Sequence, residues 1–457
     1  MRLLVIVLAL LLSPAVFAAE TPNVVLFYCD DLGYADVGPY GGQTKTPNID
    51  RLASEGVKFT DFYVSQAVCS ASRAALLTGC YNVRVGITGA LGPKNKIGLN
   101  PDERSLAEVF KSKGYATAMY GKWHLGDAPK FLPTNHGFDE WFGVPYSHDM
   151  WPKHPTNKKF PDLPLMEGEL VLKLNPEPGE LTTAITRRAV AFIERSKDKP
   201  FFLYVPHPLP HVPLGVSAPF DGKGGNGLYS DVITEIDHSV GAVLDTLKKH
   251  GLDEKTLVMF SSDNGPWMVY GDHAGVAMPL REGKGTSFDG GVRVPFLARW
   301  PGKIPPGAIC KEMAATIDIL PTMTNLIGAA PSEKKIDGKD IWPLLTKPTE
   351  AKTPHEFYAI YWGRNLQAIR SGPWKMHFAH DYRSVENLGR DGNPGRYTNE
   401  KIPDALFHIE GDIEEHNDVS EQNPEVVTRL KAYAAQIREE LGEGQKQGKG
   451  VREPGRL

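Results

Sequence analysis

The chain has 457 residues, of which 41% are hydrophobic and 23% charged, as in a soluble globular protein with a substantial core. Its length favours one large domain together with a smaller one. The net charge of −4 argues against the strongly basic surface that nucleic-acid binding requires, so we expect no nucleic-acid partner.

The first residues have the pattern of a secretory signal peptide. One early arginine precedes an apolar run from Leu3 to Leu12, and small residues follow up to Ala18. The alternative is a retained anchoring helix, but the run is short for a membrane span and no basic residue follows it. We therefore expect residues 1–18 to be removed and the protein to be exported, either to the periplasm or outside the cell, without stable membrane association.

Short apolar runs alternate with helical patterns along the next three hundred residues. Continuous runs rich in branched and aromatic residues predict buried strands at 23–28, 115–120, 200–205 and 256–262. Amphipathic spacing predicts helices at 46–56, 105–114, 182–196 and 229–251. This alternation is typical of an α/β fold, in which helices cover both faces of one sheet.

From about residue 346 the pattern changes. A linker-like stretch leads into short strands separated by turn residues, which predict a small antiparallel sheet. An amphipathic helix over 423–442 follows, and we expect the polar, glycine-rich end to fray. The expected division is a signal peptide at 1–18, a large domain at 19–345 and a C-terminal α+β subdomain at 346–457.

Polar residues capable of chemistry follow four of the predicted strands. The carboxyl ends of strands are where open α/β sheets bind ligands. A single polar pair after a strand is usually a turn or a helix cap, but four such endings at one edge favour a site. They are Asp30 with Asp31, Lys122 with His124, His207 with His211, and Asp263 with Asn264.

The acidic endings favour a bound cation. At ~4 Å and an effective dielectric constant of ~20, each pair of carboxylates repels by about 4 kcal/mol, and a cation relieves that repulsion. Asp30, Asp31, Asp263 and the Asn264 carbonyl are hard oxygen donors, which suit Ca²⁺, with Mg²⁺ as a second choice, better than Zn²⁺. Two separate turns are the alternative.

The segment CSASRAALLTG places Cys69 at or just before the start of a helix that ends at Gly79. Free amides and the helix dipole favour an anion at that point, and Arg73 adds a fixed positive charge one turn later. These residues indicate an anion-reactive centre beside a divalent metal. A thiolate nucleophile would be unusual next to hard oxygen ligands.

The same segment resembles the sulfatase signature Cys-x-Pro/Ala-x-Arg followed by LLTG. Further segments are similar to sulfatase blocks in the family's order, among them NVVLFYCDDLGYADVGPYG, GYATAMYGKWHLG, SSDNGP and REGKGTSFDGGVRVP. The pattern is most similar to the arylsulfatase A and N-acetylgalactosamine-6-sulfatase type. In that family a maturation enzyme oxidises the cysteine to formylglycine, whose hydrated aldehyde is the nucleophile.

The resemblance implies an alkaline-phosphatase-like mixed sheet flanked by helices on both faces, with a smaller C-terminal antiparallel sheet plus helix. It implies a Ca²⁺ site near the modified Cys69, formed by Asp30, Asp31, Asp263 and Asn264. It also implies that Arg73, Lys122 and Lys284 neutralise the sulfate oxygens.

Two histidines and a serine complete the roles that the resemblance implies. His211, with help from Lys284, protonates the leaving oxygen, and His124 takes a proton from the hydrated aldehyde. Ser147 contacts the substrate. We expect a sulfated carbohydrate or another small sulfated molecule as the substrate.

Two rival functions remain at this point. A phosphatase or phosphodiesterase of the same fold would use Ser or Thr as its nucleophile and add histidine ligands for two metals, whereas this chain has Cys69 and Asn264. A non-catalytic binder of sulfated glycans would have no need of the nucleophile. We expect Arg293 to be a structural ion pair and His207 to be a loop residue.

Two positions depart from the common signature. Ala71 stands where proline is most common, although alanine is also a family variant, and Cys80 stands where arginine is usual. Three of the four cysteines, at 29, 80 and 310, are left for disulfides if Cys69 is modified, and no pairing is favoured. His148, Trp151 and His154 are expected either at the pocket mouth or in packing roles.

Overall fold

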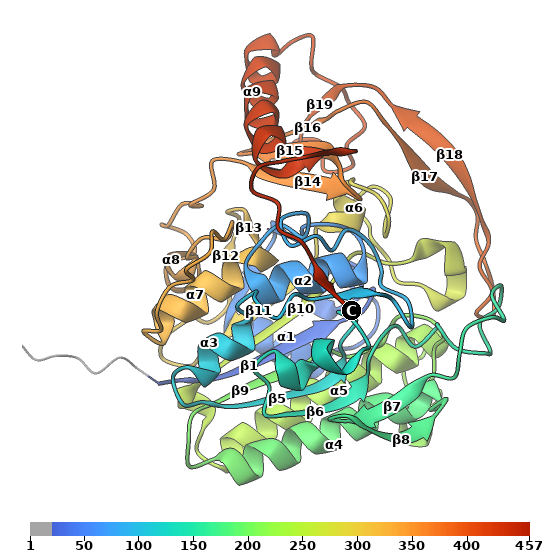
Figure 1. The fold of residues 1–457 in the computed structure, drawn as a ribbon, viewed down its shortest axis with the longest axis vertical. Coiled ribbons are helices and arrows are strands. Elements are labelled where there is room, and N and C mark those ends of the chain that lie inside the picture. Colours follow the sequence, from blue (N-terminus) through green and yellow to red (C-terminus); the bar gives the residue numbers. More distant parts are fainter. Residues whose placement is uncertain (1–20) are drawn as a thin grey trace, which may run out of the picture.

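A computed structural model describes residues 21–457, so the expected signal peptide lies outside the described residues. A ten-stranded mixed sheet forms the centre of the molecule, and helices cover both of its faces (Figure 1). The predicted α/β fold class, including the smaller C-terminal sheet and helix, is confirmed. The boundary between residues 345 and 346 stays a prediction.

The middle of the sheet consists of parallel strands. β1 (Asn23–Cys29) lies between β10 (Thr256–Ser262) and β9 (Phe201–Val205), and β9 also pairs with β5 (Ala116–Lys122). These are the four strands that the apolar runs predict. The sheet order is β12-β2-β11-β10-β1-β9-β5-β6-β7-β8. Its outer strands are β2 (Val57–Phe59), β6 (Glu140–Val144), β7 (Pro164–Glu167), β8 (Leu170–Leu174), β11 (Phe296–Arg299) and β12 (Ala308–Cys310).

Each face of the sheet has its own hydrophobic core because successive strand residues point to opposite sides. In β1, Val24 and Leu26 belong to one core, and Val25 and Phe27 belong to the other. The first core contains buried residues of α2 (Cys69–Thr78), α3 (Leu106–Lys111) and α7 (Ile319–Leu326). The second contains buried residues of α1 (Pro47–Ser54), α4 (Pro178–Ser196) and α5 (Leu228–Lys249).

The C-terminal subdomain is a four-stranded antiparallel sheet packed against one helix, α9 (Pro424–Leu441). Leu430 and Ala434 of α9 lie in the same core as Tyr358 and Ile360 of the small sheet and as the first face of the large sheet. The subdomain therefore shares a core with the large domain. Its strands are β14 (Tyr358–Trp362), β15 (Asn365–Ser371), β16 (Trp374–His377) and β19 (Ala405–His408).

Buried ion pairs also join the subdomain to the large domain. Nζ of Lys375 lies 2.7 Å from Asp289, the first residue of α6 (Asp289–Val292), and Arg370 lies 2.9 Å from Asp61. Arg293 contacts Asp61 at 3.1 Å as well. The expected structural role of Arg293 is therefore confirmed.

A two-stranded ribbon projects from the subdomain along one side of the large domain (Figure 1). It consists of β17 (His380–Asn387) and β18 (Arg396–Ile402), which we call the arm. The arm contacts the loops that follow β10, since the amides of Gly389 and Gly395 both donate to the carbonyl of Val269. These contacts extend the C-terminal subdomain to the neighbourhood of the strand ends.

The expectation that the C-terminal end frays is wrong. β22 (Gly455–Arg456) pairs with β4 (Ile97–Gly98) of the large domain, and the Arg452 guanidinium binds the buried carboxylate of Glu103. A polar, glycine-rich composition does not reveal such pairing because backbone hydrogen bonds and one ion pair hold the segment. The short pairs β3 (Phe62–Tyr63) with β13 (Ala314–Ala315) and β20 (Gly442–Glu443) with β21 (Lys446–Gln447), and helix α8 (Trp342–Thr346), complete the fold.

The four cysteines are free and buried in the described structure. In residues 21–457, no helix has the length and apolar composition needed to cross a membrane.

Candidate active site

Two neighbouring parallel strands bring the acidic residues together. β1 ends at Cys29, opposite Ser262 at the end of β10, so the residues that follow both strands emerge at one edge. The amide of Asp31 donates to Oδ1 of Asp263 at 3.1 Å. Asp31 has a φ of 64°, a left-handed conformation that is uncommon outside glycine and marks a constrained turn.

Helix α2 begins at Cys69 and directs its first turn at this edge. Val68 precedes the helix in an extended conformation, and Gly79 ends it with a φ of 67°. One turn after Cys69, the Arg73 guanidinium donates to Oδ2 of Asp263 at 2.8 and 3.0 Å. The predicted helix start at Cys69 is thus observed, with Arg73 fixed against an acid of the neighbouring strand.

β5 supplies Lys122 as its last residue. Its ammonium forms an ion pair with Asp30 and donates to Oγ of Ser147 at 3.1 Å. His124 follows in a left-handed conformation with a φ of 66°, and its Nε2 lies 2.8 Å from the carbonyl of Leu91. Because a carbonyl only accepts, Nε2 carries the proton and Nδ1 of the neutral ring is a bare acceptor.

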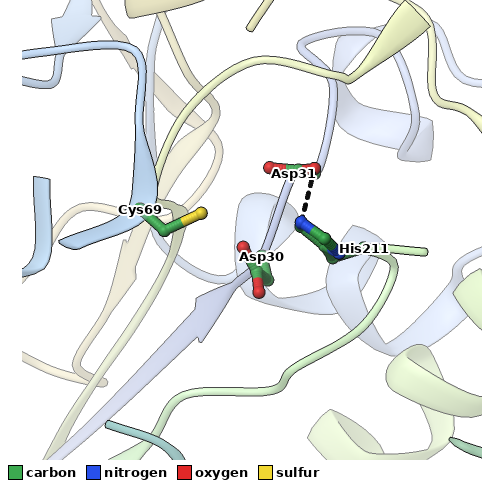
Figure 2. Close-up of side chains that lie close together, drawn as sticks. All are labelled: Asp30, Asp31, Cys69 and His211. Carbon is green, nitrogen blue, oxygen red and sulfur yellow. Dashed lines mark ion pairs between the residues drawn. The ribbon is translucent and has the colours of Figure 1, made fainter. Parts of the chain in front are cut away.

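Loops supply the remaining groups. His211 lies after β9, and its Nε2 is 3.6 Å from Oδ2 of Asp31. Nζ of Lys284 lies 2.7 Å from Oδ1 of Asp31 and 3.4 Å from Sγ of Cys69. Figure 2 shows Asp30, Asp31, Cys69 and His211 directed at a common centre, and one potential ligand atom from each lies within 4.8 Å of the others.

Three carboxyl groups and three cationic side chains pair within this buried centre. The pairs are Lys122 with Asp30, Lys284 with Asp31, and Arg73 with Asp263. Burial by itself raises the pKa of Asp30, but Lys122 and the other cations outweigh burial and hold that pKa well below its usual value. For Asp263, burial and the neighbouring Asp30 raise the pKa to about 7.

The donor set fits a hard divalent cation. Oδ1 of Asp30 and Oδ1 of Asn264 are buried and have no hydrogen-bond partner among the described residues. Buried acceptors of this kind are costly unless something binds them. Together with the carboxylates of Asp31 and Asp263 they form an all-oxygen group, which is the chemistry that Ca²⁺ or Mg²⁺ prefers.

Burial, followed by the charge of Asp30, raises the pKa of the Cys69 thiol far above its ordinary value. Since the thiolate is the reactive form of cysteine, the unmodified side chain is a poor nucleophile near neutral pH. Burial also lowers the pKa values of His124 and His211, so both rings are neutral in this state.

The structure thus brings together the residues predicted for the site. His207, in contrast, lies in the second core, where its ring stacks on Phe27 and its Nε2 lies 3.1 Å from Oγ of Ser239. Trp151 packs with Val144, so its role is in packing. The residues that converge at the edge are Asp30, Asp31, Cys69, Arg73, Lys122, His124, Ser147, His211, Asp263, Asn264 and Lys284.

Two further residues lie against the site and were not predicted. The Trp267 ring is 5.3 Å from the His211 ring, and Nζ of Lys284 lies 4.5 Å above it. Nη2 of Arg383 on the arm donates to the carbonyl of Lys284 at 3.0 Å. Trp267 follows Asn264 by three positions, which is a usable signal. Nothing near Arg383 in the sequence indicates its proximity to the site.

Residues 22–329 match the Sulfatase family model, and residues 353–454 match the model for the C-terminal region of aryl-sulfatase. The chain belongs to the sulfatase family. Arylsulfatase A of Bos taurus is 39% identical over 458 residues, covering 93% of this chain and 89% of that protein. N-acetylgalactosamine-6-sulfatase of Canis lupus familiaris is 36% identical over 464 residues, covering 94% and 88%.

A solved structure of the same type is that of Ps i-CgsB in complex with k-i-k-neocarrahexaose. It matches this sulfatase with a TM-score of 0.77 and 30% identity, covering 92% of this chain and 93% of that one. The family resemblance predicted from the signature is confirmed, and with it the assignment as a sulfuric ester hydrolase.

Proposed function

We propose that this sulfatase hydrolyses the sulfate esters of carbohydrates, using formylglycine made from Cys69 beside a Ca²⁺ site. The observation that carries the proposal is the environment of Cys69. Its side chain is buried at the start of α2, 3.4 Å from the Lys284 ammonium, with its thiol pKa raised. A cysteine in this environment is unsuited to act as a thiolate. Formylglycine at the same position would present a neutral hydroxyl nucleophile next to the cationic side chains.

Three fixed cations recognise the sulfate group. Arg73, Lys122 and Lys284 converge from a helix, a strand end and a loop, and each contacts a different acid. Preorganised charges of this kind stabilise the negative charge that develops on the sulfate oxygens without reorganising during the reaction. The leaving group departs as an oxygen anion, so charge stabilisation and proton donation are the two main requirements.

Asp30, Asp31, Asp263 and Asn264 would hold the metal ion. Ca²⁺, when bound, adds positive charge that polarises a sulfate oxygen. Asn264 and Asp31 orient each other, since Asp31 Oδ1 accepts from Nδ2 of Asn264 at 2.7 Å. This contact turns the Asn264 carbonyl oxygen away from Asp31 and leaves it available as a ligand.

The two histidines have complementary proton states. The bare Nδ1 of His124 can accept a proton, because Nε2 is engaged with the Leu91 carbonyl. His211 is neutral in this state, but a bound sulfate ester adds negative charge beside it and so favours its protonated form. His211 would then donate from Nε2 to the leaving oxygen, with Lys284 stabilising the charge.

Formylglycine supplies the attacking oxygen once its aldehyde is hydrated. Its formation requires a maturation enzyme as a transient partner. Ser147, which accepts from Lys122, would contact the substrate. Support for a carbohydrate substrate comes from the amino sugar in the name of the canine relative, N-acetylgalactosamine-6-sulfatase, and from the oligosaccharide bound to Ps i-CgsB.

The test compares 4-nitrophenyl sulfate with 4-nitrophenyl phosphate, because both release the same leaving group. The proposal predicts a strong preference for the sulfate and loss of turnover in Cys69→Ala with the fold retained. A preference for the phosphate, or activity that survives in Cys69→Ala, would contradict it. A subsequent screen of sulfated monosaccharides identifies the sugar and the sulfate position.

A further inference from the structure

A turn beside the active site contains two buried acceptors that have no partner. The turn follows β6, starts at Ser147 within reach of Lys122, and continues through His148 and Asp149. Nδ1 of His148 and Oδ1 of Asp149 are both buried and make no hydrogen bond to any part of residues 21–457. The His148 ring is held by its contact with the Pro213 carbonyl, and Asp149 is buried beside it.

The protonation state of His148 follows from its other nitrogen. Nε2 lies 3.1 Å from the carbonyl of Pro213, which only accepts, so Nε2 carries the proton. Burial lowers the pKa of the His148 ring, which is therefore neutral with a bare lone pair on Nδ1. Asp149 offers a second acceptor, and its other oxygen lies 3.8 Å from Nε2 of His154.

The turn lies beside the residue placed at the leaving-group side of the site. The His148 ring lies edge-on to the ring of His211, with 5.6 Å between centroids, and His211 is the residue placed to protonate the leaving oxygen. Burial lowers the pKa of His211, and the charge of the Asp149 carboxylate works against that lowering. A group attached to the sulfate through that oxygen would therefore pass next to the turn.

We propose that His148 Nδ1 and Asp149 Oδ1 bind hydrogen-bond donors of the sugar that carries the sulfate ester. This inference rests on the proposed function and specifies which residues bind the sugar part of the substrate. A sugar offers several hydroxyl or amide donors on neighbouring ring atoms, whereas a simple aryl ring offers none. A site with buried acceptors discriminates against a ligand that leaves them unpaired, because each acceptor then keeps its desolvation cost.

The experiment measures kcat/KM for the best sugar monosulfate of the screen and for 4-nitrophenyl sulfate, which has no donor. In Asp149→Ala the ratio of the sugar value to the aryl value should fall by about tenfold or more. Asp149→Asn keeps a neutral acceptor and should restore part of the ratio. The matched control is Glu169→Ala, an exposed carboxylate on the β7–β8 turn, which should leave the ratio as it is.

A deoxy analogue of the same sugar monosulfate lacks the hydroxyl that Asp149 would bind. With the wild-type enzyme its kcat/KM should be lower than that of the parent sugar monosulfate, whereas with Asp149→Ala the two compounds should have similar kcat/KM values. An unchanged ratio in Asp149→Ala would overturn the inference. Turnover of 4-nitrophenyl sulfate without turnover of any sugar sulfate would also overturn it, while sulfate-ester hydrolysis would stand. Absence of turnover of both 4-nitrophenyl sulfate and every sugar monosulfate by the wild-type enzyme would contradict the proposed function itself.

Discussion

Nζ of Lys284 lies 3.4 Å from Sγ of Cys69, although the two residues are 215 positions apart in the chain. The position of Lys284 depends on contacts of its own backbone. Its amide donates to the carbonyl of Pro266 at 3.0 Å, and its carbonyl accepts from Arg383 of the arm. Gly285 has a φ of 87°, and a Cβ there would lie 2.1 Å from Nη2 of Arg383, so only glycine permits this approach.

Arg383 should therefore act on the reaction through Lys284. Replacement by alanine removes the anchor of the Lys284 carbonyl, and displacement of a catalytic group by a fraction of an ångström is costly. We expect Arg383→Ala to lower kcat for 4-nitrophenyl sulfate by about 10- to 100-fold, with a smaller change in KM. Arg383→Lys should recover only part of the loss, because it lacks the planar fork of the guanidinium.

The matched test repeats Arg383→Ala in a Lys284→Ala background. If Arg383 acts only by positioning Lys284, Arg383→Ala should have little further effect on kcat once Lys284 is already alanine. An equal fold-loss in both backgrounds would show instead that Arg383 stabilises the site in a general way.

The sequence predicts the parts of this fold that depend on local pattern. β1, β5, β9 and β10 have continuous apolar sequences because both of their faces are buried, and the glycine that ends α2 is visible in the sequence as well. The arm is not predicted by the sequence pattern because it is a polar ribbon. Its residues in β17 are mostly half-buried or exposed, so no alternation of hydrophobic residues marks it as a strand pair.

The candidate site likewise has a part that the sequence predicts and a part that it does not. Motif spacing identifies the groups that follow strands, since parallel strands carry their ends to one edge. The contribution of Arg383 cannot be predicted that way, because it depends on how the C-terminal subdomain packs on the large domain. The unpaired acceptors of His148 and Asp149 also become visible only when every possible donor nearby is known.

Calcium should stabilise the folded protein. A cation that binds only the native state raises the midpoint of thermal unfolding. We expect addition of Ca²⁺ to enzyme dialysed against EGTA to raise that midpoint and to restore turnover. Asn264→Ala removes one of the two unpaired oxygens and should shift the response to higher Ca²⁺ concentrations, whereas Asn226→Ala, at an exposed position, should respond like the wild type. If neither the unfolding midpoint nor turnover changes on addition of EGTA or Ca²⁺, the result would contradict the metal site.

Buried His207 predicts a loss of stability in acid. Burial lowers the pKa of His207 to about 3 in the folded protein, so the unfolded chain binds an additional proton between that value and the ordinary histidine pKa of about 6.5. Stability is therefore complete above pH 6.5 and falls as the pH decreases. At pH 5 this one group costs about 2 kcal/mol relative to pH 7.

Urea unfolding of His207→Gln and of the wild type at both pH values measures this cost. The variant lacks the titrating ring, so the gap in unfolding free energy between the two proteins should narrow by about 2 kcal/mol at pH 5. A gap that is the same at pH 7 and pH 5 would show that the ring does not titrate differently on unfolding.

The C-terminal segment should contribute to stability through Arg452. Its guanidinium forms a two-point contact with Glu103 at 2.6 and 2.7 Å, and Nη2 lies 3.3 Å from Sγ of Cys80. Arg452 thus brings a positive charge to the position where the common signature has arginine in place of Cys80. Only 3% of the Glu103 side chain is exposed, so Arg452→Ala should lower the free energy of unfolding by about 2 kcal/mol.

A double variant separates the ion pair from the packing of the Arg452 stem. Glu103→Gln removes the charge that Arg452 neutralises, so adding Arg452→Ala to it should cost clearly less than in the wild type. The same cost in both backgrounds, measured from urea unfolding, would assign the effect to packing alone.

The identity of residue 69 in the mature protein tests the central claim most directly. Mass spectrometry of the peptide that contains position 69, from enzyme made in its own host and active on 4-nitrophenyl sulfate, should show the mass of formylglycine in place of cysteine. An intact thiol at position 69 in fully active enzyme would contradict the proposed mechanism.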